Sequence, residues 1–340
     1  MPFELSSGES SSTASGQKLR LIFCGTPEFA VPSLKELIAV GHEIALVVTQ
    51  PDRPVGRKQV LTAPPVKQTA LAHGLFVVQP EKIKNNLELR AQLEEIKPDA
   101  VVVVAYGRIV PKWMLELPPL GCINLHGSLL PKYRGAAPIQ WAVAMGEPVT
   151  GNTTMLLEEG LDTGPMLLQQ QTTILPGDTA VTLFERLAVM GAPLLVETLT
   201  GLAAGTLKPQ AQNESHATLA RILDREDGRM DFASHTATEL WNRWRGFQPW
   251  PGAFTFLSGK KLIIPRLQPT AWSELFVAER GATQPGEAIA TDGRLFVTCA
   301  QGTLLELLEV QPEGRNRMSV ADFLRGTSIA AGTKLDERLG

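Results

Sequence analysis

The sequence is poor in cysteine. Its three cysteines in 340 residues are Cys24, Cys122 and Cys299, and none belongs to a C-x-x-C motif or to a cluster with histidine. This scarcity excludes a disulfide framework and a cysteine-based zinc site, and we expect no bound metal. Cys24 and Cys122 border apolar runs, which is typical of buried, reduced thiols in a cytoplasmic protein.

Long apolar runs and an excess of one charge are absent as well. No stretch of about 18 apolar residues could span a bilayer, so we expect no membrane partner. The 32 Lys and Arg nearly balance the 35 Asp and Glu, so a nucleic-acid partner would need a local basic patch. Residues 1–17 are rich in serine and lack the basic start and apolar centre of a signal peptide, and we expect a disordered tail there.

Nucleotide-binding fingerprints are also missing. Gly25 stands alone after the first predicted strand, without the G-x-G-x-x-G pattern that pyrophosphate recognition requires. No G-x-x-x-x-G-K-[ST] motif occurs in the chain. These absences argue against the binding of a nicotinamide or flavin cofactor or a nucleoside triphosphate.

What the first 200 residues do contain is an alternation of apolar runs and helical patterns. The run AVVVVA at 100–105 is apolar without alternation and holds four β-branched residues, which predicts a central strand covered on both faces. The rhythm predicts an α/β fold with a doubly wound, mostly parallel, Rossmann-like sheet. We expect strands at 19–23, 44–49, 75–78 and 100–105, a further short strand that carries Asn124 and His126, and helices at 29–40, 66–73, 87–96, 111–117 and 137–145.

The chain is long enough for two domains. Paired strands at 150–157 and 166–173 and a helix at 179–200, stopped by Gly201, complete the first layer. Short strand patterns separated by turns then predict a small β-barrel, with a helix at 238–245 and strands at 253–257, 261–264, 287–290, 295–299 and 303–310. We expect a catalytic domain at 18–206, a linker at 207–230, the barrel at 231–330 and a tail at 331–340.

Two polar residues end one of the predicted strands. Asn124 and His126 are two residues apart, so their side chains point to one face of the strand. A loop follows that begins with Gly127. Ligands of an open parallel sheet bind beyond the carboxyl ends of its strands, which makes this pair a candidate site, although a lone histidine is more often an ordinary core or surface residue.

Asp162, in the segment EEGLDTGP at 158–165, has three interpretations. It could be a plain turn residue, or part of an aspartic protease, which needs two carboxylates whereas the chain has one D-T-G. If Asp162 instead converges with Asn124 and His126, the three form a general acid, an orienting carboxylate and an amide donor for an oxyanion. Without a nucleophile, this set favours direct acyl transfer to an external amine.

Two further segments carry arginine. Residues 50–58 form a loop punctuated by Pro and Gly that holds Arg53, Arg57 and Lys58, and it could equally be a solvated surface loop. Residues 241–252 interleave tryptophan and arginine, a spacing that more often packs a domain junction than stacks bases.

Taken together, these motifs resemble those of the methionyl-tRNA formyltransferases, within the formyltetrahydrofolate-dependent formyltransferases, over about residues 18–330. The matching segments are FCGTPEFAVPSL (23–34), TQPDRPVGR (49–57), VVVAYGRIVP (102–111), INLHGSLLPKYRGAAPIQ (123–140), GLDTGPML (160–167) and PWPGA (249–253). The resemblance implies 10-formyltetrahydrofolate as donor and the α-amine of methionyl-initiator tRNA as acceptor, with Asn124, His126 and Asp162 as catalytic residues.

The resemblance also assigns binding residues. The folate site would be lined by Ser128, Leu129, Leu130 and Pro131, and we expect Tyr106 and Gly107 to contribute from a neighbouring strand end. The loop with Arg57, together with Arg53 and Lys58, would contact tRNA. Well-known bacterial members continue this loop with more lysines, whereas here Lys58 is followed by Gln59 and Val60. The barrel would resemble an oligonucleotide-binding domain, and we expect a monomer.

Four rival functions stay open at this point. An amino sugar nucleotide could replace the tRNA as acceptor in the same chemistry. A glycinamide ribonucleotide formyltransferase would leave residues 231–330 unexplained, and a hydrolase would use water in place of the amine. A noncatalytic tRNA-binding protein is the rival from a different class, and the intact Asn124, His126 and Asp162 argue against it.

Overall fold

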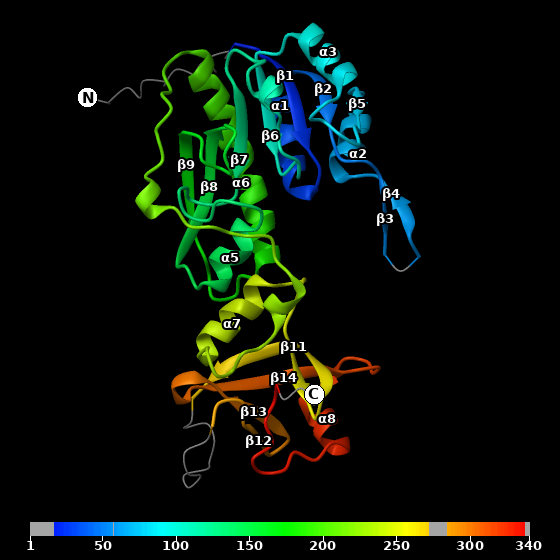
Figure 1. The fold of residues 1–340 in the computed structure, drawn as a ribbon, viewed down its shortest axis with the longest axis vertical. Helices are drawn as coiled ribbons and strands as arrows, with labels where there is room; N and C mark the ends of the chain where they lie inside the picture. Colours follow the sequence, from blue (N-terminus) through cyan, green and yellow to red (C-terminus); the bar gives the residue numbers. More distant parts are fainter. Residues whose placement is uncertain (1–16, 57, 272–283, 337–340) are drawn as a thin grey trace, which may run out of the picture. The chain divides into compact units, whose positions relative to one another are not determined.

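A computed structural model describes residues 17–56, 58–271 and 284–336 (Figure 1). The chain divides into two compact units. One consists of the residues up to Ile123 together with Ala192–Lys208, and the other of Asn124–Gly191 together with Pro209–Gly340. These units divide the chain at other positions than the domain borders expected from the sequence, which remain a prediction.

The first half of the chain builds the expected α/β sheet. Its seven strands follow the order β5-β2-β1-β6-β7-β8-β9. The β1–β2, β1–β6 and β2–β5 pairs are parallel, whereas β8 and β9 pair antiparallel, which confirms a mostly parallel sheet. The strands are β1 (Arg20–Gly25), β2 (Glu43–Val48), β5 (Val77–Val78), β6 (Ala100–Val104), β7 (Cys122–His126), β8 (Val149–Leu156) and β9 (Met166–Thr173).

Helices connect these strands as the sequence rhythm predicted. They are α1 (Val31–Ala39), α2 (Pro65–Ala72), α3 (Leu87–Ile96), α4 (Lys112–Leu115), α5 (Pro138–Ala144) and α6 (Ala180–Ala203), with a 3-10 turn at Glu28–Ala30. Helix α6 passes closely over β7 and β8 at Gly191. A Cβ on Gly191 would lie 2.5 Å from a methyl carbon of Leu125 and 3.0 Å from the Asn152 amide nitrogen.

Helix α6 corrects one expectation. Gly201 lies inside the helix, which continues to Ala203, whereas the sequence pattern placed its stop at Gly201. The backbone nitrogens of Thr206 and Leu207 both donate to the Gly201 carbonyl. A Cβ on Gly201 would come within 2.9 Å of Leu207 Cβ, so this glycine makes room for the returning chain.

The loop expected at 50–58 contains the start of a small hairpin. Strand β3 (Arg53–Val55) pairs antiparallel with β4 (Val60–Thr62). All six strand residues are exposed, including Val55, Val60 and Leu61. With no buried face, the two strands left no alternating pattern in the sequence.

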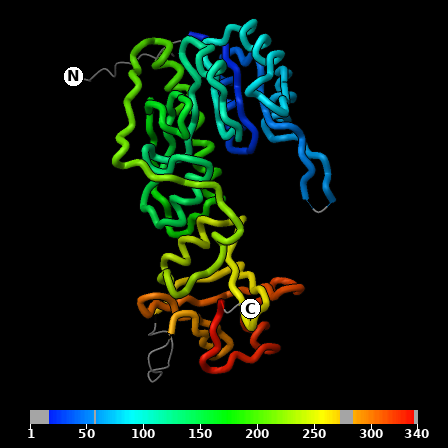
Figure 2. The backbone as a smooth tube through the Cα atoms, viewed as in Figure 1, coloured from blue at the N-terminus to red at the C-terminus, as the bar shows by residue number. Residues whose placement is uncertain are grey.

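The segment expected as a linker runs extended and pairs with the preceding residues. Arg134 N donates to Thr218 O, and Ala220 N donates back to Arg134 O at 2.6 Å. Met166 and Gln210 exchange a second pair of backbone hydrogen bonds, both 2.8 Å. We call residues 209–220 the strap; Figure 2 traces it in yellow-green. The strap contains a 3-10 turn at Glu214–His216, and another follows at Arg225–Gly228.

The remaining chain forms an antiparallel half-barrel sheet, as the pattern of short strands indicated. Its strand order is β10-β11-β14-β13-β12, with β15 paired to β14. The strands are β10 (Phe254–Leu257), β11 (Lys260–Thr270), β12 (Ala288–Thr291), β13 (Arg294–Thr298), β14 (Leu304–Pro312) and β15 (Met318–Ser319), and the helices are α7 (Ala237–Gly246) and α8 (Val320–Gly326). A 3-10 turn lies at Ala300–Gly302.

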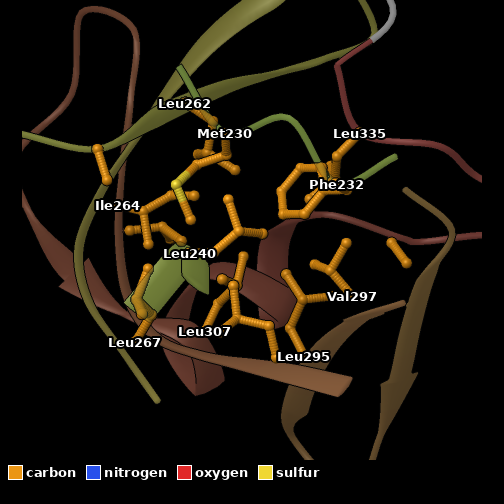
Figure 3. Packing of buried hydrophobic residues seen from close by; sticks show 14 of the residues in the cluster. Met230, Phe232, Leu240, Leu262, Ile264, Leu267, Leu295, Val297, Leu307 and Leu335 are labelled. Atoms are coloured by element: carbon orange, nitrogen blue, oxygen red, sulfur yellow. The ribbon is translucent and has the colours of Figure 1, made fainter. Parts of the chain in front are cut away.

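Buried apolar side chains from these strands and from α7 pack into one core (Figure 3). Leu240 of α7 meets Ile264 and Leu267 of β11 and Leu295 of β13 in this cluster, each 2% exposed or less. Helix α7 also packs on α5, because Gly246 lies where a Cβ would be 2.6 Å from Ala144 N. The tail expected at 1–17 falls almost wholly outside the described residues, as do Arg57 and the last four residues.

Candidate active site

Asn124 and His126 lie at the end of β7, a strand buried along its whole length. Their spacing places both side chains on one face of the strand. The Asn124 residue is 9% exposed. Within the described residues no hydrogen-bond partner is present for its side-chain amide, so both amide hydrogens remain available to an incoming ligand.

The tautomer of His126 follows from its neighbours. Nε2 lies 2.9 Å from the carbonyl oxygen of Tyr133. A carbonyl oxygen only accepts, so Nε2 carries a hydrogen and donates it. Nδ1 lies 3.7 Å from Oδ2 of Asp162. A second proton on the ring would therefore sit on Nδ1, facing the carboxylate.

Asp162 is held by its backbone as well as by its carboxylate. Its φ is +52°, in the left-handed region that aspartate tolerates better than most residues. Gly135 N donates to Oδ2 at 2.8 Å, and Nε2 of Gln212 donates to the Asp162 carbonyl at 2.7 Å. The side chains of His126 and Asp162 are 6% and 14% exposed, so the pair is shielded from water on most sides.

The segment Ser128, Leu129, Leu130 and Pro131 is fixed from β8 and β9. Thr153 Oγ1 donates to Ser128 O at 2.7 Å and accepts from Leu130 N at 3.1 Å. Nε2 of Gln169 donates to Leu130 O at 2.9 Å. Ser128 Oγ donates to Lys132 O, so the hydroxyl is already engaged within its own loop. These hydrogen bonds hold the backbone of the segment in place, two residues after His126 in the chain.

A hydrogen bond joins Tyr133, in the same loop, to Glu147. The Tyr133 hydroxyl donates to Glu147 Oε1 at 2.8 Å. Burial raises the pKa of Tyr133, and the hydrogen bond to the Glu147 carboxylate acts in the same direction. The phenol therefore stays neutral and keeps donating at physiological pH.

The other residues singled out from the sequence belong to the first compact unit. Tyr106 is buried, and its carbonyl accepts from Thr26 Oγ1 at 3.0 Å and from Gln50 Nε2 at 3.1 Å. Gly107 has a φ of +79°, which favours glycine. Both follow β6, at the carboxyl end of a parallel strand.

The basic residues of the hairpin lie at its surface. Arg53, in β3, makes an exposed ion pair with Glu81 at 3.3 Å, and Lys58 is exposed in the turn. Arg57 lies outside the described residues. Exposed cations on a surface hairpin can meet a polyanion with little rearrangement.

Several residues of the site were not predicted from the sequence. Gly135, Thr153, Gln169 and Gln212 hold the loop and the Asp162 turn, yet each acts through partners at least 16 residues away along the chain. In the part of the chain that the structure describes, no three His, Cys, Asp or Glu side chains gather as a metal-binding group. None of the helices in residues 17–56, 58–271 and 284–336 has the length and apolar character needed to cross a membrane.

The architecture is that of the formyltransferase fold. An N-formyltransferase from Helicobacter canadensis, in complex with folinic acid and dTDP-3-aminofucose, matches with a TM-score of 0.62 at 19% identity over 86% of this chain and 98% of its own. HypX from Aquifex aeolicus, in complex with tetrahydrofolic acid, matches with a TM-score of 0.58 at 16% identity over 91% of this chain and 47% of its own. At such identities the likeness concerns the fold alone.

Sequence comparison gives the family. Residues 18–199 match the formyl transferase family, and residues 222–328 match the C-terminal domain of formyl transferases. The chain therefore belongs to the formyl transferase family. A methionyl-tRNA formyltransferase from Acidobacterium capsulatum is 63% identical over 93% of this chain and 99% of its own, and one from Koribacter versatilis is 54% identical over 93% and 98%. These relatives confirm the resemblance recognised in the sequence.

Proposed function

We propose that this protein transfers the formyl group of 10-formyltetrahydrofolate to the α-amine of methionyl-initiator tRNA. The product is N-formylmethionyl-tRNA, which serves translation initiation. The observation that carries the proposal is the 63% identity to a methionyl-tRNA formyltransferase along nearly the full length of both chains. The reaction takes place in the cytoplasm, and the protein works as a monomer.

The proposed reaction begins with attack of the neutral α-amine on the formyl carbon. A new C–N bond forms and the formyl oxygen becomes an oxyanion. The Asn124 amide, which has no hydrogen-bond partner among the described residues, and the protonated Nδ1 of His126 donate to this oxyanion. Donors held in place before the reaction stabilise the charge without reorganisation at the moment of transfer.

Collapse of this intermediate completes the transfer. The C–N bond to the folate nitrogen breaks, the folate nitrogen gains a proton, and the amine loses one, so protons and charge balance. Asp162 holds the imidazolium of His126 by charge and accepts the amine proton through water. The bond from Gly135 N engages Oδ2, and no protein donor among the described residues occupies Oδ1, which is therefore free to receive that proton.

The donor would bind against Ser128, Leu129, Leu130 and Pro131. This segment adjoins the strand that ends in His126, and Thr153 and Gln169 hold its backbone, so a folate could lie on it without distorting the reacting groups. Tyr106 and Gly107, which follow β6, are further proposed folate-binding residues. The carbonyl oxygen of Tyr106 already accepts two hydrogen bonds from the protein. Tyr106 would therefore contribute to folate binding through the shape of its surface.

The acceptor would be recognised by residues other than the three catalytic ones. Arg53, Arg57 and Lys58 supply the basic contacts to tRNA, since the chain as a whole carries a net charge of only -3. We assign residues 18–206 to catalysis, 207–230 to a linker and 231–330 to a second, tRNA-contacting domain.

A direct assay tests this proposal. The protein is incubated with 10-formyltetrahydrofolate and charged initiator tRNA, with an amino sugar nucleotide and glycinamide ribonucleotide as competing acceptors. We expect formylmethionyl-tRNA as the main product. Absence of that product, or equal transfer to a control amine, would refute the assignment. Formate release without any acceptor would indicate a hydrolase.

A further inference from the structure

A closed ring of hydrogen bonds runs through Gln212 of the strap. Nε2 of Gln212 donates to the carbonyl oxygens of Asp162 and Gly164, each at 2.7 Å. Oε1 of Gln212 accepts from Arg134 Nε at 3.0 Å. Gly135, next to Arg134 in the chain, donates its N–H to Oδ2 of Asp162 at 2.8 Å, which closes the ring.

The amide of Gln212 is well suited to this place. Both of its hydrogens and its oxygen are engaged, and only an amide supplies two donors and an acceptor in one plane. Each carbonyl that it meets belongs to the turn carrying Asp162, whose φ of +52° is sparsely populated and depends on surrounding contacts. Gln212 thus fixes the backbone of that turn.

The other end of the ring reaches His126. Arg134 lies between Tyr133, whose carbonyl accepts from His126 Nε2, and Gly135, whose N–H binds Asp162. The Arg134 guanidinium is 6% exposed and pairs through both terminal nitrogens with Glu214 of the strap, at 2.7 and 2.9 Å. The Gln212 amide therefore links two groups to the strap. One is Asp162, which faces His126 Nδ1, and the other is the loop segment containing Tyr133, which binds His126 Nε2.

We propose that Gln212 is a positioning residue for formyl transfer, setting the relation between His126 and Asp162 without touching either substrate. This inference rests on the proposed function for its reaction, and on the geometry for its site. Small displacements of reacting groups reduce turnover steeply, whereas substrate affinity depends on other contacts. Loss of the Gln212 amide should therefore lower kcat and leave KM nearly unchanged.

Gln212→Ala and Gln210→Ala form a matched pair. Gln210 belongs to the same strap, but its side chain is exposed and makes no hydrogen bond within the described residues. We expect Gln212→Ala to lower kcat by about 10- to 100-fold with each KM changed less than about threefold, and Gln210→Ala to match the wild type. If Gln212→Ala does not fold, Gln212→Asn serves the same comparison, because its shorter side chain cannot span both carbonyls and Arg134.

A double-variant cycle separates positioning from general damage. In an Asp162→Ala background, adding Gln212→Ala should change the residual kcat by less than about twofold, because the group being positioned is already gone. The inference would be overturned if Gln212→Ala lowered kcat as much in the Asp162→Ala background as in the wild type. It would also be overturned if Gln212→Ala alone kept the wild-type kcat.

A second measurement needs no substrate. Two-bond nitrogen–proton NMR spectra of labelled histidine report which ring nitrogen of His126 carries hydrogen. The His126 ring signals should shift in Gln212→Ala and stay in place in Gln210→Ala; unchanged signals in Gln212→Ala would overturn the inference. A wild-type protein without formyl transfer would refute the proposed function alone, since the NMR comparison still tests Gln212.

Discussion

His126 Nε2 donates to the carbonyl oxygen of Tyr133 at 2.9 Å, which leaves Nδ1 as the ring nitrogen that faces Asp162. The two nitrogens therefore have separate tasks. Nε2 anchors the ring to the loop after β7, and Nδ1 is the nitrogen available for chemistry. Because the two nitrogens have separate tasks, different substitutions of His126 should have different effects on stability and activity.

Two substitutions of His126 separate these tasks. His126→Gln keeps a donor near the Nε2 position, whereas His126→Asn keeps one nearer to Nδ1. Neither supplies an acid, so we expect both to lower kcat by about 10²- to 10⁴-fold, the range for general acid–base catalysis. His126→Gln should retain more of the free energy of unfolding, measured in urea, because it can still bind Tyr133 O. Little loss of activity in His126→Asn would contradict the proposed mechanism.

Asn124→Ala tests the oxyanion donor. Removing one preorganised donor costs about 10²- to 10³-fold in kcat, and we expect that range in single-turnover formyl transfer. The free energy of unfolding should barely change, because no protein group among the described residues hydrogen-bonds to this amide. Asn85→Ala is the control, since Asn85 is exposed and should behave as wild type. Equal activity of the two variants would refute the role of Asn124.

Asp162→Asn removes a charge with little change of shape. Asparagine tolerates the left-handed φ and keeps an oxygen that can accept from Gly135 N. The loop should therefore stay in place while His126 loses the carboxylate charge that faces its Nδ1. We expect kcat to fall by about 10²-fold or more with nearly unchanged thermal unfolding. Activity within about threefold of wild type would show that the carboxylate is not needed.

Gly135→Ala tests the contact between the loop and the strap. The φ of Gly135 is +119°, and a Cβ there would lie 2.6 Å from the Ala220 carbonyl oxygen. We expect a loss of about 1 to 3 kcal/mol in the free energy of unfolding, and a lower kcat because Gly135 N binds Asp162. Gly177→Ala is the control, because its Cβ would meet no atom within 4 Å. Equal stability of the two variants would argue against a tight contact.

Glu306 predicts a pH dependence of stability in the half-barrel. Its hydrogen bonds from Arg294, at 2.7 and 3.0 Å, lower the pKa of this carboxyl, and Gln268 adds a further donor. A carboxyl whose folded pKa is lowered stabilises the fold above its unfolded pKa of about 4.3 and stops doing so as pH falls through the folded value. Glu306→Gln should lose about 1 to 3 kcal/mol at pH 7.

Urea unfolding of wild type and Glu306→Gln at pH 7, 5, 4 and 3 measures this effect. The difference between the two proteins should be constant down to about pH 5 and shrink below pH 4, as Glu306 becomes protonated. A difference that persists unchanged to pH 3 would mean that the Arg294 pair contributes nothing through charge.

Local pattern sufficed for most elements. Helix α3 (Leu87–Ile96) occupies the expected residues, because Asn86 caps it and its apolar residues recur with helical spacing. The end of β7, with Asn124 and His126, was also predicted, since an apolar strand followed by glycine is a local signal. Helix α8 was missed although Ser319 accepts from Asp322 N, a capping pattern that is visible as S-x-x-D in the sequence.

Other features leave no local trace. The β3–β4 hairpin is exposed on all six strand residues, so no alternation marks it. The strap looked like an irregular linker because its partners lie far away along the chain: Met166 is 44 residues from Gln210, and Arg134 is 84 residues from Thr218. Gly201 resembled a helix stop and instead makes room for Leu207.

The sequence by itself determined which residues are candidates for the chemistry, because residue type, strand period and motif spacing are properties of neighbouring positions. It placed Asn124 and His126 on one face and marked Asp162 as their distant candidate partner. Only the tertiary structure decided that Asp162 lies 3.7 Å from His126, that Tyr133 fixes the ring, and that Gln212 holds the turn. Those contacts depend on how the chain folds back on itself, and the free energy that selects them comes from packing and hydrogen bonds between segments far apart in the chain.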